Sequence, residues 1–365
     1  MKRMSRVAAF LEGAIMCNIA GYAGKKRAAP ILIEMMKRQE FYDGGMSTGI
    51  ATIHEGKLYF RKVLGDTETL LRETDALELP GTVGIIHSRP GGDFIPYAHP
   101  HIATSGRVAS VHNGGSHVER EERMHRNEIC NELVARGHGF TSDVIMEEES
   151  ITYPRLSDGR TVAVGEAFVN FFEDRVARGF SHVEAMNLAT ETFYMDLVSV
   201  LITADAPDRI YAQRVSTPMN CAIGDGETYI ATARFAFPDA LQEKSMALPL
   251  ENVCIIERGK LTVTDVRHTR ERVAEITPKV FAEAYRQISA LLMERGKENP
   301  VTYPEIEIYN TTHFEGIWPE SHPLTQRAHL GYEILYQLHR EGRLHSETKW
   351  TPDGAKQRVY MYIDK

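Results

Sequence analysis

The amino-acid sequence predicts an α+β protein in which two layers of β-sheet are covered by helices, with a smaller unit at the C-terminal end. Two observations support this prediction. Groups of short apolar segments bounded by turn residues alternate with groups in which apolar residues recur at helical spacing. A chain of 365 residues is also long for a single hydrophobic core, so we expect one domain of about 250 residues and an appendage.

The first predicted elements alternate between strand and helix. Residues 17–24 (CNIAGYAG) predict a strand, and a helix follows in which apolar residues recur at helical spacing over 31–36. Residues 50–63 predict a hairpin around a Glu-Gly-Lys turn. Residues 82–88 and 106–115 predict buried strands that end in glycine-rich turns, where chemistry is often found.

The middle of the chain predicts a long helix and then a run of strands. The helix covers residues 165–194, because phenylalanines and a valine recur there on one face. Five later segments predict strands, at 196–204, 209–214, 228–233, 253–257 and 260–266.

The pattern becomes helical again after about residue 270. Thr277 can cap a helix that has Pro278 at its first position and Gly296 at its end. A second helical pattern runs from Leu324 to about Arg340, and a Pro-Asp-Gly turn separates the two strand-like segments that follow. A helix followed by a hairpin resembles a winged-helix unit.

The chain therefore divides into three parts. We expect residues 1–16 to be a leader, whose apolar stretch is interrupted by Glu12 and is too short for a secretory signal peptide. Residues 17–270 form the main domain, and residues 271–365 form a C-terminal helical domain that resembles a winged helix.

Composition favours small-molecule chemistry in the cytoplasm. The net charge of −8 and the pI near 6.0 provide no overall field that would attract nucleic acid. No apolar run approaches the roughly 20 residues of a membrane-spanning helix. The four cysteines lie far apart and form no CxxC pair, so we expect reduced thiols, no metal and no cofactor.

Four motifs follow one another along the main domain. They read CNIAGYAG at 17–24, IIHSRPGG at 85–92, YAHPH at 97–101 and VHNGG at 111–115. In order and spacing they resemble the glutaminase domain of class II glutamine amidotransferases, and most closely the glutaminase half of glucosamine-6-phosphate synthases. Weaker likenesses extend the resemblance over residues 17–265.

This resemblance implies the four-layer αββα sandwich of N-terminal-nucleophile hydrolases, with Cys17 as the nucleophile. In such enzymes the cysteine stands at the true N-terminus. Its freed α-amino group, with an ordinary pKa of about 7.7 to 8.0, takes the thiol proton and later passes it to ammonia. We expect either cleavage of residues 1–16 or a translation start at Met16 followed by removal of that methionine. Without either event the site should be inactive.

The resemblance also implies roles for residues around the nucleophile. The side-chain amide of Asn113 and the backbone N–H of Gly114 would meet the negative charge that develops on the substrate amide oxygen. An Asn-Gly-Gly triplet is by itself only a tight-turn signal. Arg89 would bind the α-carboxylate of glutamine with its planar guanidinium. His99 and His101 would shape the pocket wall and bind no metal.

Three segments depart from the family pattern. Asn18 replaces the glycine that normally follows the nucleophile, and the segment after Arg89 reads PGGDF. The closing SxTDTE run of the family is replaced by SDVIME, so its aspartate, which binds the substrate amino group, falls on Ile145 in ungapped register. Asp143 or Glu147 would then take that role, or the substrate is not free glutamine.

We therefore expect a glutaminase that forms a Cys17 thioester and supplies ammonia to an acceptor. The acceptor domains of the family do not fit into the remaining residues, so we predict an acceptor-binding partner protein and a homo- or hetero-oligomer. Two alternatives stay open: an amidohydrolase for a γ-glutamyl or unrelated amide on the same fold, and a non-catalytic glutamine-binding regulatory protein. Seven basic against five acidic residues in 324–365 do not favour DNA binding.

Overall fold

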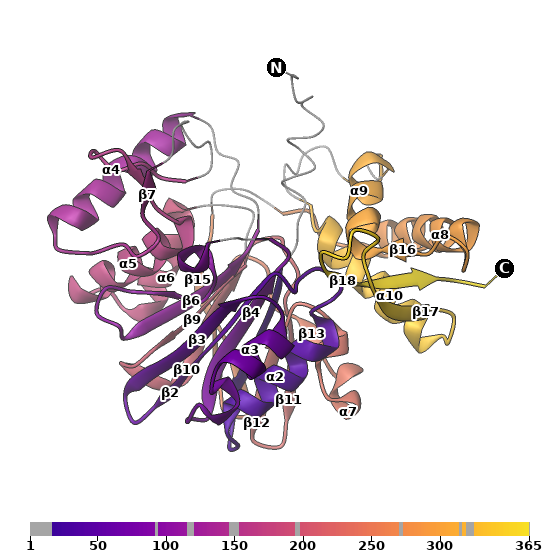
Figure 1. The fold of residues 1–365 in the computed structure, drawn as a ribbon, viewed down its shortest axis with the longest axis horizontal. Coiled ribbons are helices and arrows are strands. Elements are labelled where there is room, and N and C mark those ends of the chain that lie inside the picture. Colours follow the sequence, from indigo (N-terminus) through magenta and orange to yellow (C-terminus); the bar gives the residue numbers. More distant parts are fainter. Residues whose placement is uncertain are drawn as a thin grey trace.

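The computed structural model describes residues 17–91, 94–114, 120–145, 153–193, 198–269, 273–313, 316–318 and 325–364. The predicted leader at 1–16 and Glu147 therefore lie outside the described residues. Within the described part, two large antiparallel sheets carry helices on their outer faces, and a small three-stranded sheet lies with its own helices at one side (Figure 1). This confirms the α+β class and the layered order of helix, sheet, sheet and helix.

The first large sheet contains the strand that follows Cys17. Its order is β13-β11-β12-β1-β4-β2-β3. Ile19 and Ala23 of β1 face the space between the sheets, whereas Ala20 and Tyr22 face the helix layer, as the two-residue period of a strand requires. The strands are β1 (Asn18–Ala23), β2 (Ser47–His54), β3 (Lys57–Leu64), β4 (Val83–Arg89), β11 (Asn220–Gly224), β12 (Glu227–Ala231) and β13 (Met246–Ala247).

The second large sheet has the order β15-β14-β10-β9-β6-β5. Its strands are β5 (His101–Ile102), β6 (Val108–Asn113), β9 (Val198–Thr203), β10 (Ala206–Arg214), β14 (Asn252–Glu257) and β15 (Lys260–Arg267). Apolar side chains of both sheets, among them Ile85, Val111, Val200 and Ile210, form the core between them. Burial of each such side chain contributes about 1.5 to 3 kcal/mol, so this core holds the two sheets together.

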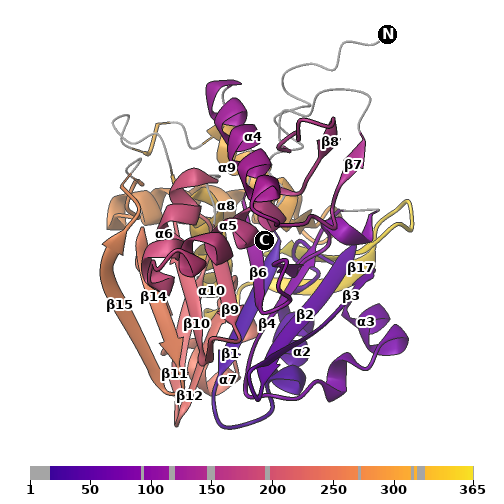
Figure 2. The same ribbon diagram turned by 90° about the vertical axis from the view of Figure 1, so that its left-hand side faces the viewer.

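Helices and short turns cover the outer faces of the two sheets (Figure 2). The first sheet is covered by α2 (Ala28–Gln39), with α3 (Thr67–Glu73), α7 (Asp239–Gln242), η1 (Ala76–Glu78) and η3 (Arg234–Ala236) nearby. The second is covered by α5 (Val164–Ala177) and α6 (His182–Thr192), with α4 (Arg120–Ala135) against α5. The remaining short elements are η2 (Ile95–Tyr97) and the strand pair β7 (Val144–Ile145) and β8 (Arg160–Thr161).

The single helix predicted over 165–194 is wrong. The chain leaves the helical conformation at Gly179, which has a φ of +92°. Ser181 then starts α6 with a capping box, because its side chain accepts from the Glu184 backbone N–H while the Glu184 carboxylate accepts from the Ser181 N–H. Helices α3 and α4 were not predicted.

The C-terminal unit contains α8 (Pro278–Arg295), β16 (Val301–Thr302), α9 (Tyr303–His313), α10 (Arg327–Arg340), β17 (His345–Trp350) and β18 (Gln357–Tyr362), with the sheet order β16-β18-β17. Thr277 caps α8 as expected, since its side chain accepts from the Val280 N–H at 3.3 Å. Helix α10 begins at Arg327, later than predicted, and β16 and α9 were not predicted. None of the described helices has the length and apolarity needed to cross a bilayer.

The core of the C-terminal unit includes residues of the main domain. Tyr42 and Ala233 belong to the same apolar cluster as Ile288, Leu330 and Leu335. The C-terminal unit is therefore packed directly against the main domain, and the proposed boundary at 270/271 is not a gap between two separate cores.

Candidate active site

The two large sheets bring Cys17 and Asn113 together. Cys17 immediately precedes β1 in the first sheet, and Asn113 is the last residue of β6 in the second. The Cys17 backbone N–H donates to Asn113 Oδ1 at 2.9 Å, and Asn113 Nδ2 donates to the Cys17 carbonyl oxygen at 2.6 Å. Because Asn113 is buried, this reciprocal pair of hydrogen bonds holds its side chain against the backbone of the predicted nucleophile.

Backbone geometry after Asn113 fits the predicted donor role of Gly114. Gly114 has a φ of +151°, a value that residues with side chains rarely adopt. The carbonyl oxygen of Asn113 accepts a hydrogen bond from Thr217 Oγ1 at 3.3 Å. A side-chain amide carries two N–H donors, so Asn113 can serve both the Cys17 carbonyl and a substrate oxygen.

The Cys17 thiol is protonated at neutral pH in this environment. The pKa of the thiol is raised to about 12, chiefly by burial; the positive charge of Arg89 lowers it, and the negative charges of Asp43 and Glu307 add to the rise. A resting thiolate is therefore disfavoured, so a reaction at this sulfur would require removal of the thiol proton.

Arg89 ends strand β4 beside Cys17. Ser88 is paired with Asn18 across the antiparallel strands β4 and β1, so Arg89, which follows Ser88, lies opposite Cys17, which precedes Asn18. Arg89 Nη1 donates to the Tyr97 carbonyl oxygen at 3.0 Å. A guanidinium carries five N–H donors, so this bond still allows a bidentate contact with a carboxylate.

His101 belongs to a cluster of four imidazole rings, formed with His87, His99 and His112. The ring centroids of His87 and His99 lie 4.0 Å apart, and those of His99 and His101 lie 4.5 Å apart. His87 Nε2 lies 3.0 Å from the carbonyl oxygen of His112, whose own ring nitrogens contact serine hydroxyls at 2.8 and 2.9 Å. Burial lowers the pKa of His87 and of His112 to about 3, so both are neutral. Among the described residues, no three His, Cys, Asp or Glu are placed to hold a metal ion.

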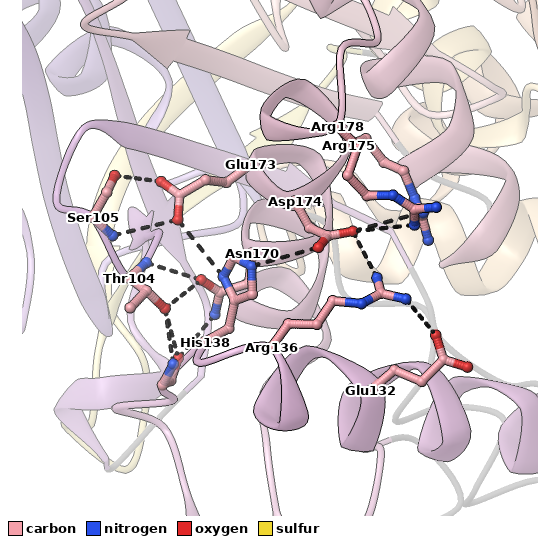
Figure 3. A network of polar contacts seen from close by, with 11 residues as sticks. Thr104, Ser105, Glu132, Arg136, His138, Asn170, Glu173, Asp174, Arg175 and Arg178 are labelled. Atoms are coloured by element: carbon pink, nitrogen blue, oxygen red, sulfur yellow. Dashed lines mark hydrogen bonds and ion pairs between the residues drawn. The ribbon is translucent and has the colours of Figure 1, made fainter.

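One face of α5 anchors the loop that leads to Asp143. Figure 3 shows Asn170 and Asp174, which lie one turn apart and project toward this loop. Asn170 Oδ1 accepts from the Thr104 N–H at 2.9 Å, and Asn170 Nδ2 donates to the Gly139 carbonyl oxygen at 3.0 Å. Asp174 accepts from Arg136 Nη1 at 2.9 Å. The loop entrance is therefore fixed by side chains of one helix.

The same face of α5 holds the segment in which the family aspartate is missing. The Glu166 carboxylate accepts from both the backbone N–H, at 2.8 Å, and the hydroxyl of Ser142. Asp143, which follows, forms an ion pair with Arg160. Ile145, at the register position of the family aspartate, is 80% exposed. The carboxylate predicted to bind the substrate amino group thus already has a cationic partner.

Polar residues in segment 40–46 adjoin the site and were missed from the sequence. Asn18 is buried, and its Nδ2 donates to the Glu40 carbonyl oxygen at 3.2 Å. The buried Glu40 carboxylate accepts from Ser88 Oγ at 2.7 Å and from the Thr67 N–H at 3.0 Å. In the sequence, the only local indication of the contact between Asn18 and Glu40 was that Asn18 replaces the glycine of the family pattern.

Comparisons by sequence identify relatives of the main domain. No known protein-family model matches the chain. The chain is similar to the glutamine–fructose-6-phosphate aminotransferase (isomerizing) of Pyrococcus horikoshii, with 31% identity over 254 residues, 69% of this chain and 38% of that protein. The enzyme of the same name from Zymomonas mobilis shows 28% identity over 294 residues, 80% of this chain and 42% of that protein. The chain thus spans about two fifths of the length of these curated relatives.

Solved structures show the same fold. The glutamine phosphoribosylpyrophosphate amidotransferase from B. subtilis superposes with a TM-score of 0.54 at 13% identity, over 81% of this chain and 64% of that one. A structure described as the allosteric regulatory enzyme of purine biosynthesis gives a TM-score of 0.55 at 13% identity, over 81% and 63%. These structures agree with the expected αββα arrangement. Together with the sequence relatives, they place in this chain a glutamine amidotransferase domain of class II, with the N-terminal-nucleophile fold.

Proposed function

We propose that this protein hydrolyses the side-chain amide of glutamine at Cys17 and supplies the ammonia to an acceptor. The observation that supports this most directly is the reciprocal pair of hydrogen bonds between Cys17 and Asn113, which joins the nucleophile to the expected oxyanion donor. Arg89 lies beside them, where its guanidinium can bind the α-carboxylate of glutamine. The sequence relatives are named as glutamine-dependent aminotransferases, which agrees with this substrate.

The proposed reaction has two halves. In the first, the Cys17 thiol gives its proton to the free α-amino group of the same residue while the sulfur bonds to the side-chain carbonyl carbon of glutamine. Asn113 Nδ2 and the Gly114 N–H meet the charge on the carbonyl oxygen. The C–N bond then breaks, the proton passes from the Cys17 ammonium to the leaving nitrogen, and ammonia departs from a thioester. In the second half, water hydrolyses the thioester to glutamate and free Cys17.

A free amine at Cys17 is essential to this scheme. A thiol with a pKa near 12 stays protonated at neutral pH, so it needs a base within reach. The Cys17 nitrogen donates a hydrogen to Asn113 Oδ1, and an amine held in the same way keeps its lone pair for the thiol proton. We therefore propose that residues 1–16 are absent from the active enzyme, through cleavage or through a start at Met16.

The ammonia acceptor is proposed to be bound by an acceptor domain or by a partner protein. The sequence relatives are aminotransferases of fructose 6-phosphate, and this chain spans about two fifths of their length. Residues 271–365 are proposed as a C-terminal domain that packs against the main domain, and this unit is the candidate docking surface for the partner.

A second candidate substrate is an amide other than glutamine. Its support is the ion pair between Asp143 and Arg160, together with the exposed Ile145 at the register position of the family aspartate. A substrate without an α-amino group would not need that carboxylate.

The first experiment combines intact mass with ammonia release. A purified chain that begins at Cys17 should release ammonia from glutamine, and Cys17→Ala should abolish that release. Cys130→Ala is the matched control, because Cys130 is a free cysteine buried in the helix layer. A panel of γ-glutamyl and unrelated amides separates the two candidate substrates. A chain that begins at Cys17 and binds glutamine without Cys17-dependent turnover of any amide would overturn the proposal in favour of a glutamine-binding regulatory protein.

A further inference from the structure

Arg358 of β18 is a cation of the C-terminal unit that is buried against the main domain. Its side chain is 4% exposed, and its Nη2 lies 3.2 Å from Oδ1 of the equally buried Asp43. Its Nη1 donates to the Gly44 carbonyl oxygen at 2.8 Å. The next residue, Val359, donates its N–H to the Phe41 carbonyl oxygen at 2.8 Å. Separating a buried ion pair is strongly unfavourable, so β18 and segment 40–46 move together.

Segment 40–46 in turn holds the residue next to the nucleophile. The Glu40 carbonyl oxygen accepts from Asn18 Nδ2 at 3.2 Å. A Cβ added at Gly44 would lie 2.7 Å from that carbonyl oxygen and 3.2 Å from Asn18 Nδ2, so the packing leaves no room for adjustment. A displacement of segment 40–46 is therefore transmitted through Asn18 to Cys17.

The same segment also holds the end of strand β4. The Glu40 carboxylate and the Gly45 N–H contact Ser88 Oγ at 2.7 and 2.9 Å. The Met46 N–H donates to the Arg89 carbonyl oxygen at 2.9 Å. Segment 40–46 therefore positions both Cys17, the proposed nucleophile, and Arg89, the proposed carboxylate ligand.

Tyr332 of α10 contacts Asn18 directly. The Tyr332 hydroxyl lies 3.5 Å from Asn18 Oδ1, at the outer limit of a hydrogen bond. The Tyr332 ring is buried, with its centroid 4.0 Å from that of Tyr303 in a stacked arrangement and 6.0 Å from that of Tyr42. Asn18 stands where the family pattern has glycine. The side chain that distinguishes this chain beside its nucleophile is therefore the one that contacts the C-terminal unit.

From these contacts we infer that the C-terminal unit sets the geometry of the glutaminase site, with Arg358 and Tyr332 as positioning residues. The inference rests on the proposed glutaminase function of Cys17. The two residues act on different parts of the site. The Tyr332 hydroxyl contacts Asn18 and so affects the nucleophile, whereas Arg358 acts through segment 40–46 on both Cys17 and Arg89. A partner that shifts the C-terminal unit would thereby change the rate of ammonia release.

Tyr332→Phe tests the first contact, with Tyr303→Phe as its matched control. Each variant removes one hydroxyl from a pair of stacked, buried rings, but the Tyr303 hydroxyl donates to the Ala328 carbonyl oxygen at 2.7 Å inside the C-terminal unit. Tyr332→Phe should lower kcat for ammonia release about threefold at unchanged KM for glutamine, as expected for loss of one neutral hydrogen bond. Tyr303→Phe should leave both constants unchanged.

Arg358→Met tests the second contact, with Arg340→Met as its control. Arg340 forms an exposed ion pair with Glu243 at 3.0 Å across the same interface but away from segment 40–46. Arg358→Met should change both kcat and KM and lower kcat/KM for glutamine by about tenfold or more, because small misplacements of reacting groups can reduce rates about 100-fold. Arg340→Met should keep the wild-type kcat/KM.

Hydrogen exchange of the full chain provides a readout that does not need turnover. Arg358→Met should accelerate exchange in peptides covering 40–46 and 83–91, whereas Arg340→Met should not. If the wild-type chain releases no ammonia but exchange responds in this way, the coupling stands and the proposed glutaminase function fails. If the wild-type chain is active and the kinetics and exchange of both test variants match their controls, the inference is wrong. If Arg358→Met does not fold, the comparison of kcat between Tyr332→Phe and Tyr303→Phe decides whether the inference holds; equal kcat values would show that it is wrong.

Discussion

Asn113→Ala separates the structural contribution of this side chain from its proposed catalytic one. The variant removes the two hydrogen bonds to Cys17, at 2.9 and 2.6 Å. A hydrogen bond of this kind contributes about 0.5 to 1.5 kcal/mol net, so the free energy of unfolding should fall by about 1 to 3 kcal/mol. Loss of one oxyanion donor lowers kcat by about 100- to 1000-fold, which corresponds to about 2.7 to 4 kcal/mol. The loss in kcat should therefore be large even where the variant is still folded.

The assay is ammonia release at saturating glutamine by a chain that begins at Cys17, together with urea unfolding. Asn252→Ala is the control, because Asn252 Nδ2 donates to the Thr264 carbonyl oxygen at 2.8 Å between β14 and β15, in the strands at one edge of the second sheet. It should lose about 1 kcal/mol of stability and keep its kcat. A folded Asn113→Ala chain whose kcat stays within about threefold of the wild type would refute the oxyanion role.

Three further predictions concern substrate binding, packing and pH. Arg89→Lys should raise KM for glutamine about tenfold or more, because an ammonium cannot form the bidentate contact with a carboxylate; an unchanged KM in steady-state kinetics would contradict that role. Gly165→Ala should destabilise the fold by about 1 to 3 kcal/mol, since its Cβ would lie 2.4 Å from His101 Cδ2, whereas Gly139→Ala meets open space and should change urea unfolding by less than about 0.5 kcal/mol. Burial lowers the pKa of His87 to about 3, so only the unfolded chain binds its proton between pH 7 and 5. The free energy of unfolding should then fall by about 2 kcal/mol for this histidine as the pH falls over that range, and His87→Gln should flatten the slope by that amount; equal slopes would show that His87 is protonated in the folded state.

Local sequence patterns predicted the elements that have a strong period and clear caps. Helix α8 is an example, because Thr277, Pro278 and Gly296 mark both of its ends and its buried residues recur at helical spacing. The error at 165–194 arose because the apolar period continues on both sides of Gly179. The sequence also contains a capping box at Ser181, which starts a new helix there and so separates α6 from α5.

The missed helices α4 and α9 have weak amphipathic patterns. Residues 120–135 are rich in charged and polar side chains, and residues 303–313 alternate apolar and polar types without a clear helical stripe. A period-based prediction therefore has little to detect in these segments. In the fold, α4 packs against α5 and α9 against α10, so each of these helices makes contacts outside its own segment.

The site divides in the same way into local and distant contributions. The positions of Cys17, Asn113, Gly114 and Arg89 at strand ends could be predicted, because each belongs to a short motif there. Contacts of the C-terminal unit could not be predicted, since the bond from Arg358 to the Gly44 carbonyl joins residues 314 positions apart and no local pattern encodes it.

These distant contacts bear on whether the main domain is independent of the C-terminal unit. Without that unit, Asp43 would lose the cation that faces it, and Tyr42 would lose the cluster that buries its ring. Loss of a buried ion pair and exposure of an aromatic ring both destabilise a fold. Asn18 would also lose its contact with Tyr332, and a glycine at that position would have made no such contact. Three main-domain residues, Asn18, Tyr42 and Asp43, therefore depend on contacts with the C-terminal unit. This argues that the two units form one cooperative structure around Cys17.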